Sequence, residues 1–284
     1  MTQPLELFLF TCDPDLATRA VAAGVDGIVV DWERAGKHDR QASAGTEINA
    51  DTIEDLCRIR AASGSRILCR INAVGDETAD EVEAAVEAGA DELLVPMVRC
   101  REDVQLAVDI ARGRIEVGIL VETVEAVEDA FELGELPISR VFVGLNDLAI
   151  ERQSPSIFSA LIDGTVEAVR AAFTAPFGVA GLTVPDAGDP LPCRLLMGEL
   201  ARLRCEYTFL RRSFRRDIVG RDLDVEVPRM REAVLQATNR SHEDVRDEHT
   251  ELTRMIRELE TSAAGHHLAI SDLEERVQAG RDSA

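Results

Sequence analysis

Residues 90–123, ADELLVPMVRCREDVQLAVDIARGRIEVGILVET, decide the fold of this chain. They contain two short β-rich apolar runs, ELLVPM at 92–97 and EVGILVE at 116–122. Between these runs lies REDVQLAVDIARG at 101–113, whose apolar residues recur at the spacing of an amphipathic helix. A strand, a crossover helix and a second strand form the unit from which parallel sheets are built. The segment therefore predicts a parallel sheet covered by helices.

The same unit recurs from the N-terminus to about residue 235. Helix candidates include 13–24, where Asp13 and Pro14 supply an N-cap and a first-turn proline. Eight consecutive units favour a closed (β/α)8 TIM barrel over an open doubly wound sheet, and 284 residues are enough for one such domain. The eight predicted strands are LELFLF (5–10), GIVVDW (27–32), RILCRI (66–71), ELLVPM (92–97), EVGILVE (116–122), RVFVGL (140–145), FGVAGL (177–182) and YTFLRRSF (207–214).

The composition changes after about residue 240. We therefore divide the chain into a barrel domain, 1–239, and a C-terminal helical extension, 240–284, with a role in oligomerisation. The segment TSAAGHH at 261–267 predicts a break before a final helix. The extension carries an apolar or semi-apolar stripe at heptad spacing, which predicts a helix docked on a neighbouring subunit or on its own barrel. The stripe consists of Val245, His249, Leu252, Ile256 and Leu259.

Composition excludes several classes of protein. A formal net charge of -22 disfavours nucleic acid and anionic membranes, whose binding requires Lys and Arg against phosphate. No apolar run approaches the roughly 20 residues of a membrane span, and the N-terminus lacks the features of a secretory signal, so we expect a cytoplasmic protein. The six cysteines form no CxxC pair, which favours buried thiols over a zinc site or disulfides.

The basic residues restrict the chemistry. The 31 basic residues comprise thirty arginines and a single lysine, Lys37, which lies in a polar stretch that predicts a loop. A Schiff-base aldolase or a pyridoxal phosphate enzyme needs a lysine in its site. If the protein makes or breaks carbon–carbon bonds, a metal ion is therefore the favoured electron sink.

Catalytic groups of such barrels lie at the C-terminal ends of the strands, and polar residues cluster there in this sequence. Glu122 and Asp147 end adjacent strands and could hold one Mg²⁺ or Mn²⁺ ion, although each carboxylate could instead cap the next helix. Arg70 ends an apolar strand, where it either binds a substrate carboxylate and a developing enolate or pairs with a nearby acid. The polar residues at strand ends are Asp31, Glu33, Arg34, Arg70, Asn72, Glu122, Thr123, Asn146 and Asp147.

The segments DGIVVDWE, CRIN, ADELLVPMV, ILVET and VFVGLNDLA, in this order and spacing, resemble the HpcH/HpaI aldolase and citrate lyase β-subunit family of phosphoenolpyruvate/pyruvate TIM barrels. The resemblance covers about residues 5 to 215. It implies that Glu122 and Asp147 hold a divalent cation and that Arg70 contacts the substrate carboxylate and the enolate. It also implies an acid near metal-bound water at Glu33, and a substrate-carboxylate site around Asn146 and Asp147.

We add Pro96, near the end of the fourth predicted strand, to the substrate-binding candidates. The sequence departs from the family pattern at three places. Arg34 occupies the position of the acid–base histidine, Leu120 replaces a glutamine, and Trp32, Glu33 and Arg34 replace a Leu-Glu-Asp segment. Glu33 could therefore act as a base or orient metal-bound water. The departures place the chain in neither the aldolase branch nor the citrate-lyase-like branch of the family.

We conclude from the sequence that the chain is a class II, metal-dependent carbon–carbon lyase or aldolase. It would act through the enolate of a 2-oxo acid resembling pyruvate or oxaloacetate, or of a related carboxylate or acyl-CoA. The resemblance further implies a homo-oligomer, a trimer or hexamer. The alternative is a barrel that has lost catalysis and serves as a binding or assembly subunit. Four arginines at the end of the eighth predicted strand could bind a phosphate or a coenzyme A tail, neutralise nearby carboxylates or bridge subunits: Arg211, Arg212, Arg215 and Arg216.

Overall fold

The computed structural model describes residues 5–34 and 51–281, without the side chains of Arg212 and of residues 263–281. Its eight parallel strands form a closed barrel in the sequential order β1 to β8, which confirms the predicted (β/α)8 fold. Lys37 lies outside the described residues. The strands are β1 (Glu6–Phe10), β2 (Gly27–Asp31), β3 (Arg66–Arg70), β4 (Glu92–Val95), β5 (Glu116–Val121), β6 (Val141–Val143), β7 (Phe177–Leu182) and β8 (Tyr207–Leu210).

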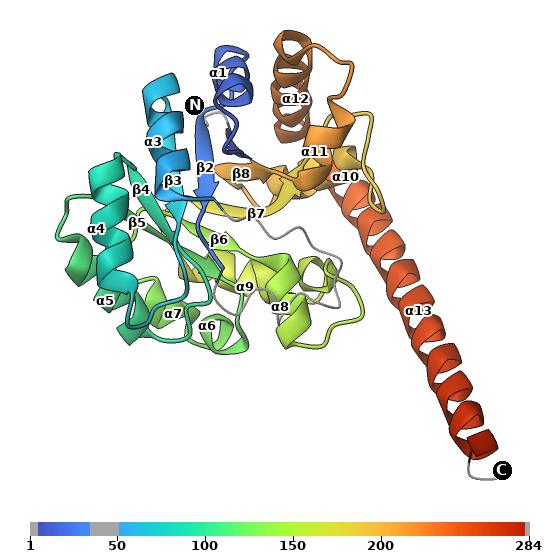
Figure 1. The fold of residues 1–284 in the computed structure, drawn as a ribbon. Coiled ribbons are helices and arrows are strands. Elements are labelled where there is room, and N and C mark those ends of the chain that lie inside the picture. The colour runs from blue at the N-terminus through green and yellow to red at the C-terminus, as the bar shows by residue number, and fades with distance from the viewer. Residues whose placement is uncertain (1–4, 35–50, 282–284) are drawn as a thin grey trace.

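Helices surround the barrel, and local sequence signals set their ends (Figure 1). Asp13 caps the first helix by accepting from the backbone N–H of Asp15 at 2.9 Å. Gly89 ends another helix in the left-handed conformation, at φ 89°. The helices are α1 (Pro14–Ala22), α3 (Ile53–Ala62), α4 (Thr78–Ala88), α5 (Arg101–Ala111), α6 (Val124–Glu128), α7 (Ala130–Leu133), α8 (Leu145–Glu151), η1 (Ser159–Leu161), α9 (Thr165–Ala172), α10 (Cys193–Arg202), α11 (Arg212–Asp217), α12 (Leu223–Thr238) and α13 (His242–Arg281).

Side chains fill the interior of the barrel, and strand alternation determines what lies above them. The interior is apolar and includes Tyr207, whose ring packs edge-on against that of Phe8 with 6.0 Å between centroids. Because alternate residues of a strand face the same side, the next inward position of each strand lies toward the C-terminal end of the barrel. The interior residues are Phe8, Val29, Leu68, Leu94, Leu120, Phe142, Tyr207 and Phe209. Two residues further along lie, among others, Asp31, Arg70, Pro96, Glu122 and Gly144.

A buried ionic cluster lies at the opposite, N-terminal end of the strands. Glu92 is completely buried, and its carboxylate accepts from Arg140 Nε at 2.7 Å and from Arg66 Nε at 3.0 Å. The Arg140 guanidinium lies 4.7 Å from the ring centroids of both Phe8 and Tyr207. Charges removed from water are tolerated only when they are paired and hydrogen-bonded, so these groups depend on one another.

The C-terminal helix differs from its prediction. Helix α13 is continuous from His242 to Arg281 and projects away from the barrel, so the break predicted at 261–267 is wrong (Figure 1). Alanine and serine tolerate helix well, and the single Gly265 costs only about 1 kcal/mol there. Strand β8 also ends earlier than predicted, at Leu210 rather than residue 214, because α11 begins at Arg212.

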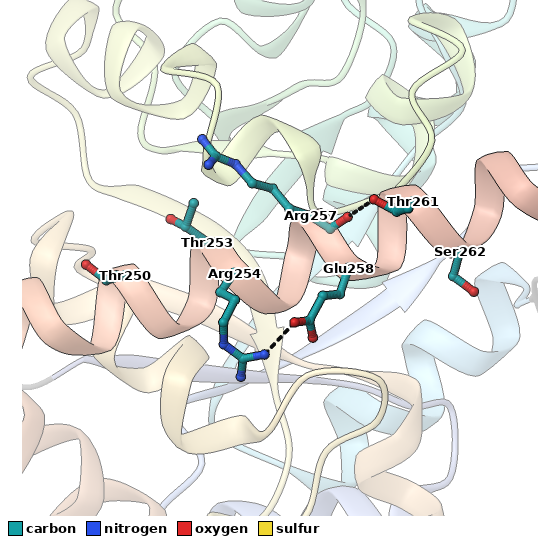
Figure 2. A pocket seen from close by; sticks show the side chains of 7 residues that line it. All are labelled: Thr250, Thr253, Arg254, Arg257, Glu258, Thr261 and Ser262. Carbon is teal, nitrogen blue, oxygen red and sulfur yellow. Dashed lines mark hydrogen bonds and ion pairs between the residues drawn. The ribbon is translucent and has the colours of Figure 1, made fainter.

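The first half of α13 packs on its own barrel. Leu252 and Ile256 are fully buried in the main core, and His249 Nδ1 lies 3.0 Å from Glu199 of α10. Ser159 Oγ donates to Glu260 at 2.6 Å. The opposite side of this helix is a polar surface, where Arg254 pairs with Glu258 at 2.6 Å (Figure 2). The heptad stripe therefore serves, at least in part, as an intramolecular contact.

We expect Leu252→Ala to lower the free energy of unfolding by about 2–3 kcal/mol, because the substitution leaves a cavity between α13 and the barrel. Chemical denaturation monitored by circular dichroism measures this loss. The control is Leu235→Ala on α12, whose side chain is 54% exposed and whose loss should change stability by less than about 0.5 kcal/mol. Equal effects of the two substitutions would contradict the docked position of α13.

Candidate functional site

An ion pair between β2 and β3 begins the site. Arg70 donates from Nε and Nη2 to the two carboxylate oxygens of Asp31, at 2.8 and 2.7 Å, and its Nε lies 3.4 Å from Glu33 Oε2. Asp31 is fully buried. Burial alone lowers the pKa of Arg70, but the charge and hydrogen bonds of Asp31 raise it above its ordinary value. The guanidinium is always a cation, and the bidentate contact holds it in one orientation.

The Arg70 guanidinium also lies 5.1 Å from the ring centroid of Phe10 on β1. The Phe10 ring in turn packs on Phe209 of β8, with 5.1 Å between centroids. An arginine held between a carboxylate and an aromatic face has little freedom to change rotamer. The arrangement suits a group that must present its charge in one direction.

Glu122 follows β5 and is buried, with 3% of its surface exposed. Its Oε1 accepts from the backbone N–H of Met97 at 3.0 Å, and Met97, directly after Pro96, has a left-handed φ of 53°. Burial raises the pKa of Glu122 to about 8, and the charges of Asp147 and Glu33 add to this rise, while Arg70 and the Met97 N–H oppose it. Without a bound metal ion this carboxyl therefore keeps its proton at neutral pH, even though Arg70 is nearby.

The turn after β6 brings a second carboxylate toward Glu122. Gly144 precedes α8, and a Cβ at this position would overlap the Glu122 carboxylate, so only glycine lets the two strand ends approach so closely. Asn146 and Asp147 lie in the first turn of α8 and are half-buried. Helix α6, after Glu122, is capped by the Thr123 side chain, which accepts from Ala126 N at 3.1 Å. Glu122 is thus not needed as a helix cap.

Arg34 lies at the edge of the same mouth and is bound to the backbone. Its Nη2 donates to the carbonyl of Asp51 at 2.6 Å, and its own N–H donates to Asn72 Oδ1 at 2.8 Å. Asn72 also hydrogen-bonds Glu81 of α4 through its side chain. A guanidinium does not lose its proton in proteins, so Arg34 cannot act as a base in place of a histidine.

Sequence reasoning missed Asp51. Its carboxylate is buried and accepts from the backbone N–H of Asp31 at 2.9 Å, and burial raises the pKa of this carboxyl. Asp51 thereby supports the residue that holds Arg70. It lies twenty positions after Asp31 in the sequence and follows no strand, so no local pattern indicated its role.

The sequence-predicted residues fall into two groups. Arg70, Glu33 and Asp147 all act electrostatically on Glu122, so these four side chains share one mouth. Asn146 and Pro96 flank Asp147 and Met97 in the chain. Their substrate contacts stay predictions.

A divalent cation fits the chemistry of these donors. Glu122 and Asp147 are oxygen ligands, and a positive charge would offset both the burial of Glu122 and the repulsion between the two acids. Among the residues that the structure describes, no three His, Cys, Asp or Glu side chains form a complete cation cage. Mg²⁺ commonly binds one or two carboxylates and takes its remaining ligands from water and substrate, so two suffice.

A surface hollow elsewhere lacks these features. It follows one side of α13, as Figure 2 shows, and none of the sequence-predicted site residues lines it. Its single carboxylate, Glu258, is already paired with Arg254 at 2.6 Å. The lining residues are Thr250, Thr253, Arg254, Arg257, Glu258, Thr261 and Ser262.

Comparisons with solved structures support the fold. Citrate synthase SbnG is 18% identical, with 74% of this chain and 86% of that chain covered at a TM-score of 0.54. Tryptophan synthase from M. tuberculosis is 14% identical, with 82% and 94% covered at a TM-score of 0.54. At such low identity these likenesses concern the barrel alone. None of the described helices is long and apolar enough to cross a membrane.

Sequence comparison identifies the family. No curated protein matches the sequence. The HpcH/HpaI aldolase/citrate lyase family matches residues 5–172, more than half of the chain, and this range contains Glu33, Arg70, Glu122 and Asp147. The chain therefore belongs to the HpcH/HpaI aldolase/citrate lyase family.

Proposed function

We propose that the protein is a divalent-cation-dependent carbon–carbon lyase or aldolase. Its substrate would be a 2-oxo acid resembling pyruvate or oxaloacetate, or a related carboxylate or acyl-CoA, and the reaction would pass through an enolate. The observation that carries the proposal is Glu122, a buried carboxyl whose pKa is raised to about 8 beside a second acid, Asp147. Perturbed carboxyls at the C-terminal end of a barrel are typical of functional sites.

Each residue has a distinct task in this proposal. Glu122 and Asp147 would hold Mg²⁺ or Mn²⁺, which supplies Lewis-acid polarisation of a substrate oxygen when bound. Arg70, fixed by Asp31 at 2.7–2.8 Å, binds the substrate carboxylate and stabilises negative charge on the enolate oxygen. The backbone N–H groups of Asn146 and Asp147, in the first turn of α8, would receive the substrate carboxylate, and Pro96 would form part of the wall.

Proton transfer falls to Glu33 among the acids around this mouth. Glu33 is 2% exposed, and its carboxylate lies 3.4 Å from Arg70 Nε, so it is held beside the group that receives the developing charge. Arg34 cannot take the proton. A carboxylate in this position can accept a proton from a substrate hydroxyl or orient the water that does so.

Calorimetric titration of the metal-stripped protein tests the proposal. We expect Mg²⁺ or Mn²⁺ to bind, and pyruvate or oxaloacetate to bind more tightly once the cation is present. Glu122→Gln and Asp147→Asn should each weaken cation binding by about tenfold or more, which corresponds to about 1.4 kcal/mol. Glu125→Gln, on the half-exposed side of α6, serves as the matched control.

If the wild-type protein binds neither the cation nor the oxo acid, the proposed enolate reaction is ruled out. The assembly subunit would then be the better candidate, because α13 extends beyond the barrel that it packs against (Figure 1). For either role we propose a homo-oligomer, a trimer or hexamer. Its preferred small-molecule partner would be a carboxylate, and nucleic acid is disfavoured by the net charge of -22.

A further inference from the structure

Arg211, the residue directly after β8, has buried donors without partners. Its Nε and Nη2 atoms are both inaccessible to solvent, and neither hydrogen-bonds to any group. The hydroxyl of Ser213, two residues later, is likewise buried and unpaired. Three orphaned polar atoms within three residues are unusual, because buried polar groups nearly always have partners.

The chain around Arg211 leaves space for its side chain. The Arg211 backbone N–H donates to Leu182 O of β7 at 2.9 Å, which fixes its position at the strand end. A Cβ on Gly181 would lie 2.9 Å from Arg211 Cβ, and one on Gly188 would lie 2.9 Å from Nη2. Gly188 also has a left-handed φ of 122°, which strongly favours glycine. Two glycines therefore accommodate the arginine.

The nearby acids do not satisfy these donors. Asp217 acts on Arg211 only through its charge, and its carboxylate instead accepts from Thr183 Oγ1 at 2.6 Å and Arg216 Nε at 3.0 Å. Asp189 also acts through charge alone. Burial lowers the pKa of Arg211, whereas the paired Arg70 has a raised pKa. Arg211 as a whole is half-buried, but buried donors such as its Nε and Nη2 are costly to leave unused unless a ligand supplies the acceptor.

The position of Arg211 connects it to the site already described. Arg211 lies two residues beyond Phe209, whose ring is 5.1 Å from that of Phe10, and Arg70 lies 5.1 Å from the Phe10 ring. Arg211 therefore follows β8 in phase with an inward-facing residue, at the same end of the barrel as Arg70. The loops after the seventh and eighth strands are also where TIM barrels frequently bind anionic groups.

We propose that Arg211 and Ser213 form a subsite for a second anionic group of the substrate, a phosphate or a carboxylate. The Nε and Nη2 edge of a guanidinium matches two oxygens of such a group, and the Ser213 hydroxyl adds a third donor. The assignment deepens the proposed function and rests on it: the substrate carries one anionic group at Arg70 and another at Arg211.

Metal-free calorimetry with inorganic phosphate and with acetate tests the subsite. We expect one of these anions to bind wild type, and to bind Arg211→Met and Ser213→Ala at least about tenfold more weakly. Arg216→Met is the control, because Arg216 is on the same helix but 72% exposed, and should stay within about twofold of wild type. Phosphate binding assigns a phosphoryl group, and binding of acetate alone assigns a carboxylate. Equal affinities of wild type and Arg211→Met for both anions would overturn the proposal.

Thermal unfolding provides a second measurement. In buffer without phosphate or carboxylate, Arg211→Met should melt at the same temperature as wild type or higher, because it removes two buried donors that make no hydrogen bond. Adding the binding anion should raise the melting temperature of wild type but not of the variant. A lower melting temperature of Arg211→Met that the anion does not change would mean a structural ion pair, and would overturn the subsite.

The two proposals can fail separately. Mg²⁺ and pyruvate titrations on the same samples report on Glu122 and Asp147. If anions bind at Arg211 but neither the cation nor pyruvate binds, the subsite proposal stands and the lyase proposal is rejected. If the cation and pyruvate bind but Arg211→Met does not change anion binding, the lyase proposal stands and the subsite proposal is rejected.

Discussion

In the absence of divalent cations, the Glu122→Gln variant is expected to be more stable than wild type, and the difference should grow with pH. The pKa of Glu122 rises from 4.5 in an open environment to about 8 in the folded protein. Below pH 4.5 both states are protonated, and the acid has no effect on stability. Between pH 4.5 and 8 the unfolded chain is ionised while the folded chain keeps its proton, so wild type loses stability as pH rises.

Above pH 8 the full penalty applies, on the order of 5 kcal/mol. Glutamine mimics the protonated acid at every pH, so the variant escapes this loss. Urea denaturation of the metal-free proteins at several pH values between 5 and 9 measures the difference directly. Groups that titrate in both proteins cancel in the comparison.

Two controls sharpen this experiment. Glu125→Gln should show no widening difference between pH 5 and 9, because the pKa of Glu125 is lowered by a backbone hydrogen bond and by Arg99. Added Mg²⁺ should stabilise wild type but not Glu122→Gln, and so narrow the difference. If the difference in unfolding free energy between Glu122→Gln and wild type stayed constant across the pH range, the raised pKa of this buried carboxyl would be contradicted.

Replacing Glu92 by leucine is expected to lower the free energy of unfolding by about 3–5 kcal/mol. The substitution leaves Arg140, which is 5% exposed, as a buried cation without its 2.7 Å acceptor. Leucine cannot accept the hydrogen bond from Ser139 Oγ, at 2.5 Å, either. Apolar packing recovers little of this loss, since the arginine stays in place.

Glu116→Leu is the matched control for Glu92→Leu. Glu116 also pairs with Arg66 but is 56% exposed, so its removal should cost less than about 1 kcal/mol. Guanidinium denaturation of both variants measures the two losses. A Glu92→Leu variant within 1 kcal/mol of wild type would mean that water reaches Arg140.

The sequence predicted the barrel because its signals are local. The run RILCRI ends one residue after the observed Arg66–Arg70 strand, and Asp13 caps the first helix as expected. Where local signals conflict, prediction failed: YTFLRRSF has strand-like composition throughout, yet only Tyr207–Leu210 pairs with its neighbours. Helix α13 continues through 261–267 because glycine and serine weaken a helix without ending it.

The candidate site was predictable where the alternation of residues along a strand determines which side chains face the inside of the barrel. Arg70 ends β3 and Glu122 follows β5, both in phase with inward-facing residues, so their convergence at one mouth could be expected. The contacts that support them could not, because they join distant segments: Asp51 binds the backbone of Asp31, and Arg34 binds the carbonyl of Asp51. Arg211 was one of four candidate arginines, and among the three whose side chains the structure describes, its buried donors without partners distinguish it from Arg215 and Arg216.

The ionic cluster of Glu92, Arg140 and Arg66 lies at the opposite end of the strands from the Arg70–Asp31 pair. Natural selection can therefore alter one end without endangering the other. Substitutions around the mouth can explore new substrates while the cluster maintains folding. The family resemblance implies a histidine at position 34, where this chain carries Arg34 at the edge of the mouth. The buried cluster that contributes to stability and the residues proposed to bind substrate thus lie at opposite ends of the barrel.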